Sequence, residues 1–545
     1  MDVLSAAEIG ACDRATTERF GVPSIDLMRA AAAAVADFAR QTFPGARRVT
    51  VLCGRGNNGG DGMMTARRLA ADGLQVTTLL LGAPEGFGPE VVTAWGELLA
   101  SANAGTVHVV QTGRELVNHN QTLQADLIVD AIVGTGFKPP LKGVAEAALA
   151  WVRQSDAPFL SIDLPSGWAA DTTQATAAGE VFPSDAVITF TAPKPAHVFA
   201  QLTRRWNQPV VVAPIGSPAE AVVSVLNMRW AGSSMELIQL PRATSANKGN
   251  FGHVLVVGGS VGRSGAPSMS ALAALRSGAG LVTAAVPAAV LAQVSAIAPE
   301  LMTFPLFAGP TDGLLGENLA PQALAALMVG KSVLAIGPGL GQAPATAKFV
   351  TALLSETKIP AVIDADALNI LSAKPDLLVE YAKERTIVLT PHPGEMARLA
   401  GITVAEVQAN RLEVARGFAR RFGVTLVLKG ARTLIAHPDG RVAVNTTGNP
   451  GMAKGGSGDL LTGLVAGLMA QHADDPARAV EAAVYLHGLA ADLAVRHMDE
   501  HTLLATDGLP QLSRAFRFDS RGQNGYVWLQ GLPVASMPDV CSQRG

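Results

Sequence analysis

The stretch Thr447-Gly448-Asn449-Pro450-Gly451-Met452-Ala453-Lys454-Gly455-Gly456-Ser457-Gly458-Asp459 decides what the second half of this chain can be. An apolar segment of helical character, residues 460–471, follows it at once. A glycine-rich loop that opens a helix presents free backbone N–H groups and the positive end of the helix dipole, which favours a phosphate. Asp459 adds a carboxylate, whose use beside a phosphate is to take a proton from an attacking hydroxyl.

Working outward from this loop, the sequence alternates strand-like and helix-like segments, which predicts an α/β fold with two domains, each built on a mainly parallel sheet. Residues 1–220 form the first predicted domain, 221–247 a connector with one strand, 248–515 the second domain, and 516–545 an irregular tail that holds Cys541. Strands are expected in the first domain at residues 48–53, 75–81, 107–110, 127–131, 159–163 and 186–190. The second domain is expected to have strands at 253–257, 281–286, 333–336, 361–364, 387–390 and 425–429, and a hairpin of 433–437 with 441–445.

Composition sets the broad class of the protein. Of the 545 residues, 48% are hydrophobic and 16% charged, which provides sizeable cores and argues against disorder. The net charge of −3 gives no indication of a nucleic-acid surface. Three scattered cysteines fit a reducing compartment, and neither a signal peptide nor a membrane span is read from the sequence. We therefore expect a soluble cytoplasmic protein that acts on small molecules, without nucleic-acid or membrane partners, and that forms a homo-oligomer.

The first domain carries its own glycine loop, Gly54-Arg55-Gly56-Asn57-Asn58-Gly59-Gly60-Asp61-Gly62, between a predicted strand and a predicted helix. Its spacing matches a dinucleotide-binding fingerprint, but the second strand does not end in the acid that usually binds the ribose. A glycine turn needed only for packing is the alternative interpretation. Because such a turn requires neither two amides nor a carboxylate, Asn57, Asn58 and Asp61 favour a binding site.

Two further polar loops follow strands of the same predicted sheet, at residues 130–138 and 163–167. The carboxyl ends of parallel strands meet at one edge, where ligands bind, so Asn58, Asp130, Asp163 and Ser166 are expected to converge there. Their oxygen ligands suit a hard cation. Caps of neighbouring loops are the alternative role for each acid.

Several residues of the second half have two possible roles. His392 lies between two prolines and is either a rigid turn residue or part of a site. Asp364 and Asp366 follow a predicted strand and either cap the next helix or hold water around Mg²⁺. Lys429 is either an exposed charge at a strand end or a contact to a phosphate or ribose.

The first domain resembles the NAD(P)H-hydrate epimerase family over about residues 5–215, through residues 53–62, 130–136 and 162–167. The resemblance implies a Rossmann-like three-layer sandwich, and potassium held by Asn58, Asp130 and Ser166. It implies substrate contacts at Asn57, Asn58, Gly59, Gly60, Asp61, Gly134, Thr135, Gly136, Phe137, Lys138, Pro139, Pro140 and Asp163.

The second domain resembles ADP-dependent NAD(P)H-hydrate dehydratases of the ribokinase-like superfamily over about residues 240–514, through residues 248–253, 337–341, 364–369, 390–395, 428–433 and the opening loop. This resemblance implies hydrate contacts at Ala266, Gly339, His392 and Asp459. The nucleotide would be bound by Lys429, Gly430, Ala431, Arg432, Thr433, Gly455, Gly456, Ser457 and Gly458.

Together these features predict an enzyme that repairs hydrated NADH and NADPH. Asp459 would deprotonate the C6 hydroxyl, which attacks the terminal phosphate of ADP with Mg²⁺ present, and phosphate then leaves. Asp163 is the predicted proton carrier of an R-to-S epimerisation in the first domain. The alternative function is a kinase for a small alcohol, fused to a binding module that has lost catalysis.

Overall fold

The computed structural model describes residues 1–533 except 102, 104, 310–312, 315–317, 319 and 523. Two compact units make up the chain. Unit 1 contains Met1–Leu226 and the segment that begins at Asp519, and unit 2 contains Asn227–Phe518. Among the described residues, we find no helix with the length and apolar character needed to cross a membrane.

Unit 1 is built on an eight-stranded sheet in the order β20-β7-β6-β5-β4-β1-β2-β3, in which only β20 is antiparallel to its neighbour. Strands β2 and β3 lie on one side of β1, and β4 to β7 lie on the other. The direction in which the chain adds strands therefore reverses at β1, which makes this a topological switch point. The strands are β1 (Arg48–Cys53), β2 (Gln75–Leu81), β3 (Thr106–Val110), β4 (Leu127–Ala131), β5 (Phe159–Ile162), β6 (Ala186–Phe190), β7 (Val210–Ala213) and β20 (Val527–Gln530).

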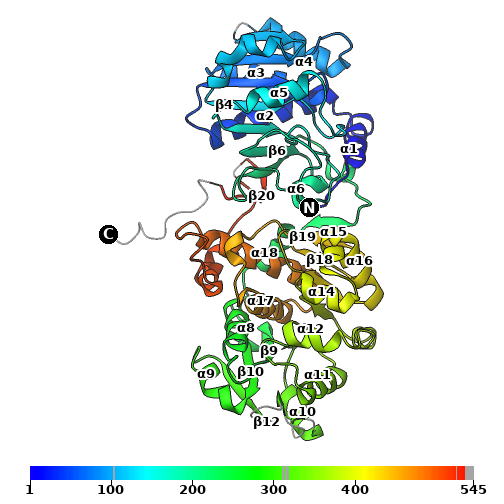
Figure 1. Cartoon of the computed structure of the whole chain (residues 1–545), viewed down its shortest axis with the longest axis vertical. Coiled ribbons are helices and arrows are strands. Elements are labelled where there is room, and N and C mark those ends of the chain that lie inside the picture. The colour runs from blue at the N-terminus through cyan, green and yellow to red at the C-terminus, as the bar shows by residue number, and fades with distance from the viewer. Residues whose placement is uncertain are drawn as a thin grey trace, which may run out of the picture. The chain divides into compact units, whose positions relative to one another are not determined.

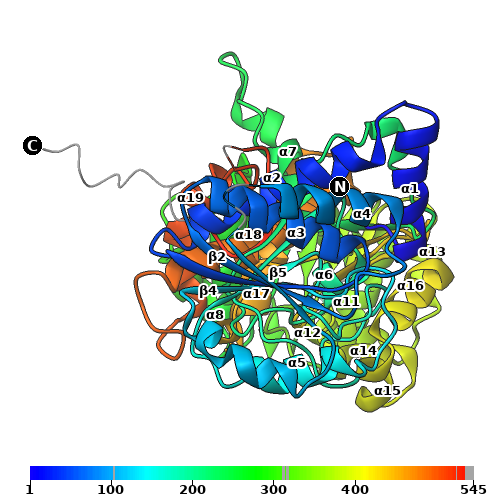
Figure 2. The ribbon, with the colours of Figure 1, turned by 90° about the horizontal axis from the view of Figure 1, so that it is seen from above.

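Helices cover both faces of this sheet, which confirms the predicted three-layer sandwich. Figure 2 shows α2, α3 and α4 on one face and α5 on the other. Strands buried on both sides explain the nearly continuous apolar runs of the sequence. The helices are α1 (Ala6–Glu18), α2 (Ser24–Thr42), α3 (Asn57–Ala71), α4 (Pro89–Ala100), the 3₁₀ segment η1 (Glu115–Gln124), α5 (Val144–Val152) and α6 (Pro195–Phe199).

The prediction that residues 516–545 form an irregular tail is wrong for the part that the structure describes. Strand β20 pairs antiparallel with β7 and closes one edge of the first sheet. Trp528 packs edge-on against Phe38, with ring centroids 6.1 Å apart, and the Tyr526 hydroxyl donates to the carbonyl of Ala34. A four-residue strand has too little periodicity to be recognised, and only the exposed edge of β7 gives it a partner. Residues 534–545, including Cys541, lie outside the described residues.

Unit 2 contains a ten-stranded sheet in the order β11-β10-β9-β14-β15-β16-β17-β18-β19-β8. Figure 1 labels β9, β10, β18 and β19 of this sheet. Its pairs are parallel except for the antiparallel β17-β18-β19 meander. The connector supplies the expected strand, β8. The strands are β8 (Met228–Trp230), β9 (His253–Val257), β10 (Leu281–Pro287), β11 (Met302–Leu306), β14 (Val333–Ile336), β15 (Ala361–Ile363), β16 (Ile387–Leu389), β17 (Thr425–Leu428), β18 (Leu434–Ala436) and β19 (Val442–Val444), with a separate pair β12 (Ala308–Gly309) and β13 (Gly313–Leu314).

The glycine-rich stretch 447–459 runs into helix α17. This helix is the central helix of unit 2 and is buried along most of its length. It packs so closely on α8 that a Cβ atom at Gly463 would lie 2.0 Å from the carbonyl oxygen of Ser270. The helices are α7 (Met235–Ile238), α8 (Gly265–Arg276), α9 (Leu291–Ser295), α10 (Pro321–Met328), α11 (Pro344–Glu356), α12 (Ala365–Leu371), α13 (Leu377–Ala382), α14 (Pro393–Ala400), α15 (Val404–Ala409), α16 (Arg411–Phe422), α17 (Ser457–Gln471), α18 (Pro476–Ala494) and α19 (Leu512–Phe516).

Candidate active sites in the two units

The glycine loop of unit 1 runs from the end of β1 into α3, at the switch point of the sheet. Its backbone passes so close to the neighbouring loop that a Cβ atom at Gly54 would lie 1.9 Å from the carbonyl oxygen of Ile132. The amide of Asn58 donates to the carbonyl of Val133 at 3.0 Å. The predicted convergence of the loops is therefore present.

Asp163 follows β5 and is buried in a network of donors. Its Oδ1 accepts from the Lys194 ammonium at 2.8 Å and from the Thr189 hydroxyl at 2.9 Å. Its Oδ2 accepts from the backbone N–H of Thr135 at 2.9 Å. Burial opposes ionisation of Asp163, but Lys194, His197 and these hydrogen bonds hold its pKa well below the usual range. Asp163 is therefore a carboxylate at neutral pH, and a poor proton donor.

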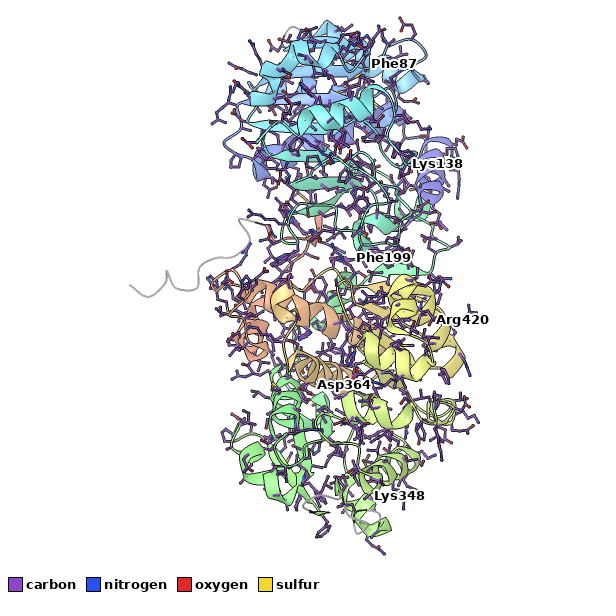
Figure 3. All side chains as sticks on the ribbon, viewed as in Figure 1. Phe87, Lys138, Phe199, Lys348, Asp364 and Arg420 are labelled. Carbon is purple, nitrogen blue, oxygen red and sulfur yellow. The ribbon has the colours of Figure 1, made fainter. Side chains whose placement is uncertain are left out.

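A cavity of about 750 Å³ opens beside this network. It is lined by the predicted residues Asn57, Asn58, Asp61, Gly134, Thr135, Gly136, Phe137 and Asp163, and also by Asp13 and Lys194. Lys138 (labelled in Figure 3), Pro139 and Pro140 continue the same loop but are not lining residues. Gly59 and Gly60 are buried within the first turns of α3.

Asp61 and Asp13 give the cavity an acidic side. Burial, together with the carboxylates of Asp163 and Asp13, raises the pKa of Asp61 well above its usual value. The pKa of Asp13 is also raised, chiefly by burial, although Lys194 opposes the shift. The cavity therefore combines an ionised carboxylate with carboxyl groups that hold their protons more strongly, which is the pairing that acid–base chemistry requires.

Of the three predicted potassium ligands, Asp130 and Ser166 are in direct contact, and Val133 links Asn58 to Ser166 through its carbonyl and its N–H. The side-chain oxygen of Asn58 is buried and has no hydrogen-bond partner. Asp130 is fully buried, and its carboxylate accepts from both the backbone N–H and the hydroxyl of Ser166, at 2.7 and 2.6 Å. Burial raises the pKa of Asp130 to about 6. A buried amide oxygen without a partner and a buried carboxylate on converging loops fit a monovalent cation with oxygen ligands.

In unit 2, Asp459 lies in the first turn of α17, directly after the phosphate-type loop. Gly456 precedes the helix with a left-handed φ of 95°. Burial, and then the charge of Asp364, raise the pKa of Asp459 to about 6, while Lys429 opposes the shift. A carboxylate with this pKa is a suitable general base near neutral pH.

The partly buried Lys429 and the buried Asp364 form an ion pair beside this loop (Asp364 is labelled in Figure 3). The ammonium lies 3.0 Å from Asp364 Oδ1, and the Thr462 hydroxyl donates to Oδ2 at 2.7 Å. A Cβ atom at Gly458 would lie 3.2 Å from the Lys429 nitrogen. The positive charge is thus close to the start of α17, so Lys429 is not a freely exposed strand-end charge.

The other predicted hydrate contacts have clear structural surroundings. His392 Nδ1 accepts from the backbone N–H of Gly394 at 3.0 Å, so this histidine caps α14, while half of its side chain is exposed. A Cβ atom at Gly339 would lie 3.2 Å from the Cβ of Ala266, which places these two residues side by side. Asp366 accepts from the backbone N–H of Gly341 at 2.8 Å and thereby anchors that loop.

Three residues that support these sites were not predicted. Lys194 neutralises Asp163 from the loop before α6. Arg411 donates to the carbonyl oxygens of Leu428 and Ala431 and braces the loop 429–433. Asp492 on α18 accepts from Gly448 at 2.9 Å. Lys194 is surrounded by prolines and alanines, which is a weak signal for a buried charge, and the other two lie in ordinary helical patterns.

A Rossmann-like unit with an acid–base cavity, followed by an α/β unit with a base at a phosphate-type helix start, defines an enzyme with two sites. Residues 254–512 match the family described as NAD(P)H-hydrate dehydratase, and residues 24–196 match the family described as YjeF-related protein N-terminus.

Similar proteins cover nearly the whole chain. The bifunctional NAD(P)H-hydrate repair enzyme Nnr of Moorella thermoacetica is 41% identical over 95% of this chain and 97% of its own. The Escherichia coli K12 enzyme of the same name is 34% identical over 94% and 93%. The chain belongs to the family of bifunctional NAD(P)H-hydrate repair enzymes. The resemblance to this family is therefore confirmed, as is the prediction of an enzyme.

A solved structure resembles part of the chain. The ADP/ATP-dependent NAD(P)H-hydrate dehydratase of Bacillus subtilis, crystallised with ATP and Mg²⁺, is 34% identical over 52% of this chain and 96% of its own, with a TM-score of 0.44.

Proposed function

We propose that unit 2 dehydrates the S hydrate of NADH or NADPH at the expense of ADP, and that unit 1 converts the R hydrate into the S hydrate. The observation that supports the dehydration most strongly is Asp459, a base with a pKa of about 6 beside the Lys429 ammonium at the start of α17. A base, a cation and free backbone N–H groups are what the transfer of a phosphoryl group to a hydroxyl requires.

In the proposed dehydration, the Asp459 carboxylate takes the proton from the C6 hydroxyl of the hydrate. The C6 oxygen then attacks the terminal phosphorus of ADP, the bond to the bridging oxygen breaks, and AMP leaves. The amides of Gly455, Gly456, Ser457 and Gly458 and the Lys429 ammonium stabilise the charge on the transferred group. The ring nitrogen expels phosphate from C6, and loss of the C5 proton restores the C5–C6 double bond.

Two cations are part of this proposal. Magnesium, when bound, would neutralise charge on the phosphates of ADP. Among the residues that the structure describes, no group of three or more His, Cys, Asp or Glu side chains could hold a metal. One or two carboxylates together with phosphate oxygens suffice for Mg²⁺, and Asp364 and Glu395 are the carboxylates next to Lys429. Asn58, Asp130 and Ser166 would hold potassium in unit 1.

In unit 1, epimerisation at C6 requires the C6–O bond or the ring to open and close again. We assign Asp163 as the carboxylate that faces this centre, with Lys194 and Thr189 holding it ionised. Because Asp163 is a poor proton donor, the proton for the departing oxygen would come from Asp61, which lines the same cavity. Asp163→Ala is expected to abolish R-to-S conversion without changing dehydration of the S hydrate.

The cellular location and assembly are also proposals. Cys12 and Cys53 are buried free thiols, which supports a reducing, cytoplasmic compartment. We retain the expectation of a homo-oligomer, which light scattering of the purified protein would test.

The deciding experiment mixes the purified protein with hydrated NADH and ADP, and follows the recovery of reduced-nicotinamide absorbance and the formation of AMP. We expect recovery of both epimers, one AMP being formed for each hydrate repaired. Failure to recover absorbance with either ADP or ATP would refute the proposed dehydration. Assays with small alcohols such as a hydroxymethylpyrimidine or a sugar test the kinase alternative.

A further inference from the structure

A partly buried carboxylate on α18, Asp492, lies behind the loop that begins at Thr447. Its Oδ2 accepts from the backbone N–H of Gly448 and its Oδ1 from the side-chain amide of Asn449, both at 2.9 Å. The oxygen of Asn449 in turn accepts from the backbone N–H of Gly451 at 3.1 Å. Both oxygens of Asp492 are therefore engaged by the segment that leads into the phosphate-type loop.

The same carboxylate attracts a residue of the other predicted nucleotide loop. The partly buried Arg432 guanidinium interacts favourably with the charge of Asp492, and it donates to the carbonyl of Thr446 at 3.1 Å. The backbone of Arg432 is left-handed, with a φ of 54°. A side chain other than glycine keeps this conformation only when its surroundings compensate for the strain. Arg432 is thus linked both to Asp492 and to Thr446, which directly precedes the loop that Asp492 contacts.

Helix α18 also sits directly against Thr447. The hydroxyl of Thr447 donates to the carbonyl of Tyr485 at 2.8 Å. A Cβ atom at Gly488 would lie 2.4 Å from that hydroxyl, so only glycine permits this approach. The start of the loop is therefore fixed by contacts spread over two turns of α18.

We propose that Asp492 is a positioning residue that joins the loop 429–433 to the loop 447–459 and sets the spacing of the two loops around the nucleotide. This inference rests on the proposed ADP site. Burial raises the pKa of Asp492 to about 6, while Gly448, Asn449 and Arg432 oppose the shift, so the carboxylate is ionised at pH 7.5. The neutral side chain of Asp492→Asn would lose the attraction to Arg432. Its N–H₂ group would also face the N–H of Gly448 or the side-chain amide of Asn449, and two donors cannot form a hydrogen bond.

The test compares Asp492→Asn with Glu481→Gln in the full-length protein. Glu481 is a second carboxylate of α18 and is buried, but its partners are His437, at 3.0 Å, and the hydroxyl of Ser234. Glu481→Gln is therefore a control for losing a carboxylate charge from the same helix. Measurements are the KM for ADP and kcat of dehydration, ADP affinity by calorimetry, the melting temperature, and epimerisation in unit 1.

We expect Asp492→Asn to raise the KM and the Kd for ADP at least tenfold, the factor that corresponds to ~1.4 kcal/mol. Glu481→Gln should lower the melting temperature but leave both constants within about twofold, because His437 and Ser234 belong to neither nucleotide loop. Epimerisation should be unchanged in both. Equal ADP constants in wild type and Asp492→Asn would overturn the inference, as would an equal rise in Glu481→Gln.

Two further outcomes separate this inference from the proposed function. If the wild-type protein neither binds nor consumes ADP, the proposed nucleotide site fails before Asp492 is tested. If Asp492→Asn does not fold, Asn449→Ala removes one of the two hydrogen bonds to Asp492, together with the bond from Gly451, and keeps the bond from Gly448; a smaller rise in the KM for ADP is expected. An unchanged KM in Asn449→Ala would then contradict the proposed role.

Discussion

The substitution Asp459→Asn tests the base at the centre of unit 2 while leaving its shape nearly unchanged. Asp459 lies in the first turn of α17, and burial together with Asp364 raises its pKa to about 6. An amide of the same size cannot accept the C6 proton. A general base contributes roughly 10²–10⁴-fold to a rate, and we expect kcat of dehydration to fall by that factor.

The same pKa sets the pH dependence of the wild-type enzyme. The base acts only when it is deprotonated, so the rate must fall as the pH drops through about 6. The ionised fraction of Asp459 is nearly complete at pH 7.5 and about one quarter at pH 5.5, so kcat should fall about fourfold over this interval. This acid limb should be absent from the residual rate of Asp459→Asn.

The assay follows reduced-nicotinamide absorbance at saturating ADP and S hydrate between pH 5.5 and 7.5, with R-to-S conversion by unit 1 as the control in the same chain. Epimerisation should be equal in the two proteins. The role of Asp459 is refuted if Asp459→Asn keeps more than about a tenth of the wild-type kcat, since loss of a base costs ~10²-fold or more. It is also refuted if the acid limb persists in Asp459→Asn.

Asp459→Asn should also stabilise unit 2 in thermal unfolding at pH 8, because the raised pKa means that an ionised Asp459 destabilises the folded state. This gain should be complete above about pH 6 and disappear as the pH falls from there toward the ordinary value of 3.8. Asn58→Ala should remove any stimulation of epimerisation by K⁺ over Na⁺, with dehydration as the unaffected control. Lys194→Met leaves the Asp163 charge unpaired and should shift the pH profile of epimerisation toward higher pH; an unchanged profile would contradict the Lys194–Asp163 pairing. Gly463→Ala should destabilise unit 2 by ~1–3 kcal/mol in denaturant unfolding, since its Cβ meets α8 at 2.0 Å. Gly417→Ala, in a helix position with nothing within 4 Å, is the matched control and should stabilise the protein by ~0.5–1 kcal/mol.

Much of the fold was predictable because the strands are buried on both faces of their sheets. Such strands are short apolar runs between turns, and β1, β2, β4, β6, β9 and β14 have the predicted bounds. Strand β20 was not predictable, because its four residues follow a polar segment and become a strand only by pairing with β7.

The sequence by itself determined the local chemistry of this protein. Glycine spacing after a strand fixes where a backbone turns and exposes N–H groups, so the loops at Gly54 and Gly455 and the adjacent Asp459 were identifiable without coordinates. Tertiary structure alone decided the charge states. Asp163 is ionised because Lys194 lies 2.8 Å away, and Asp459 becomes a base of pKa about 6 because of its burial and, second, the charge of Asp364. These pairs are 31 and 95 residues apart in the chain. Since an electrostatic shift depends on distance and burial in space, no local pattern encodes it.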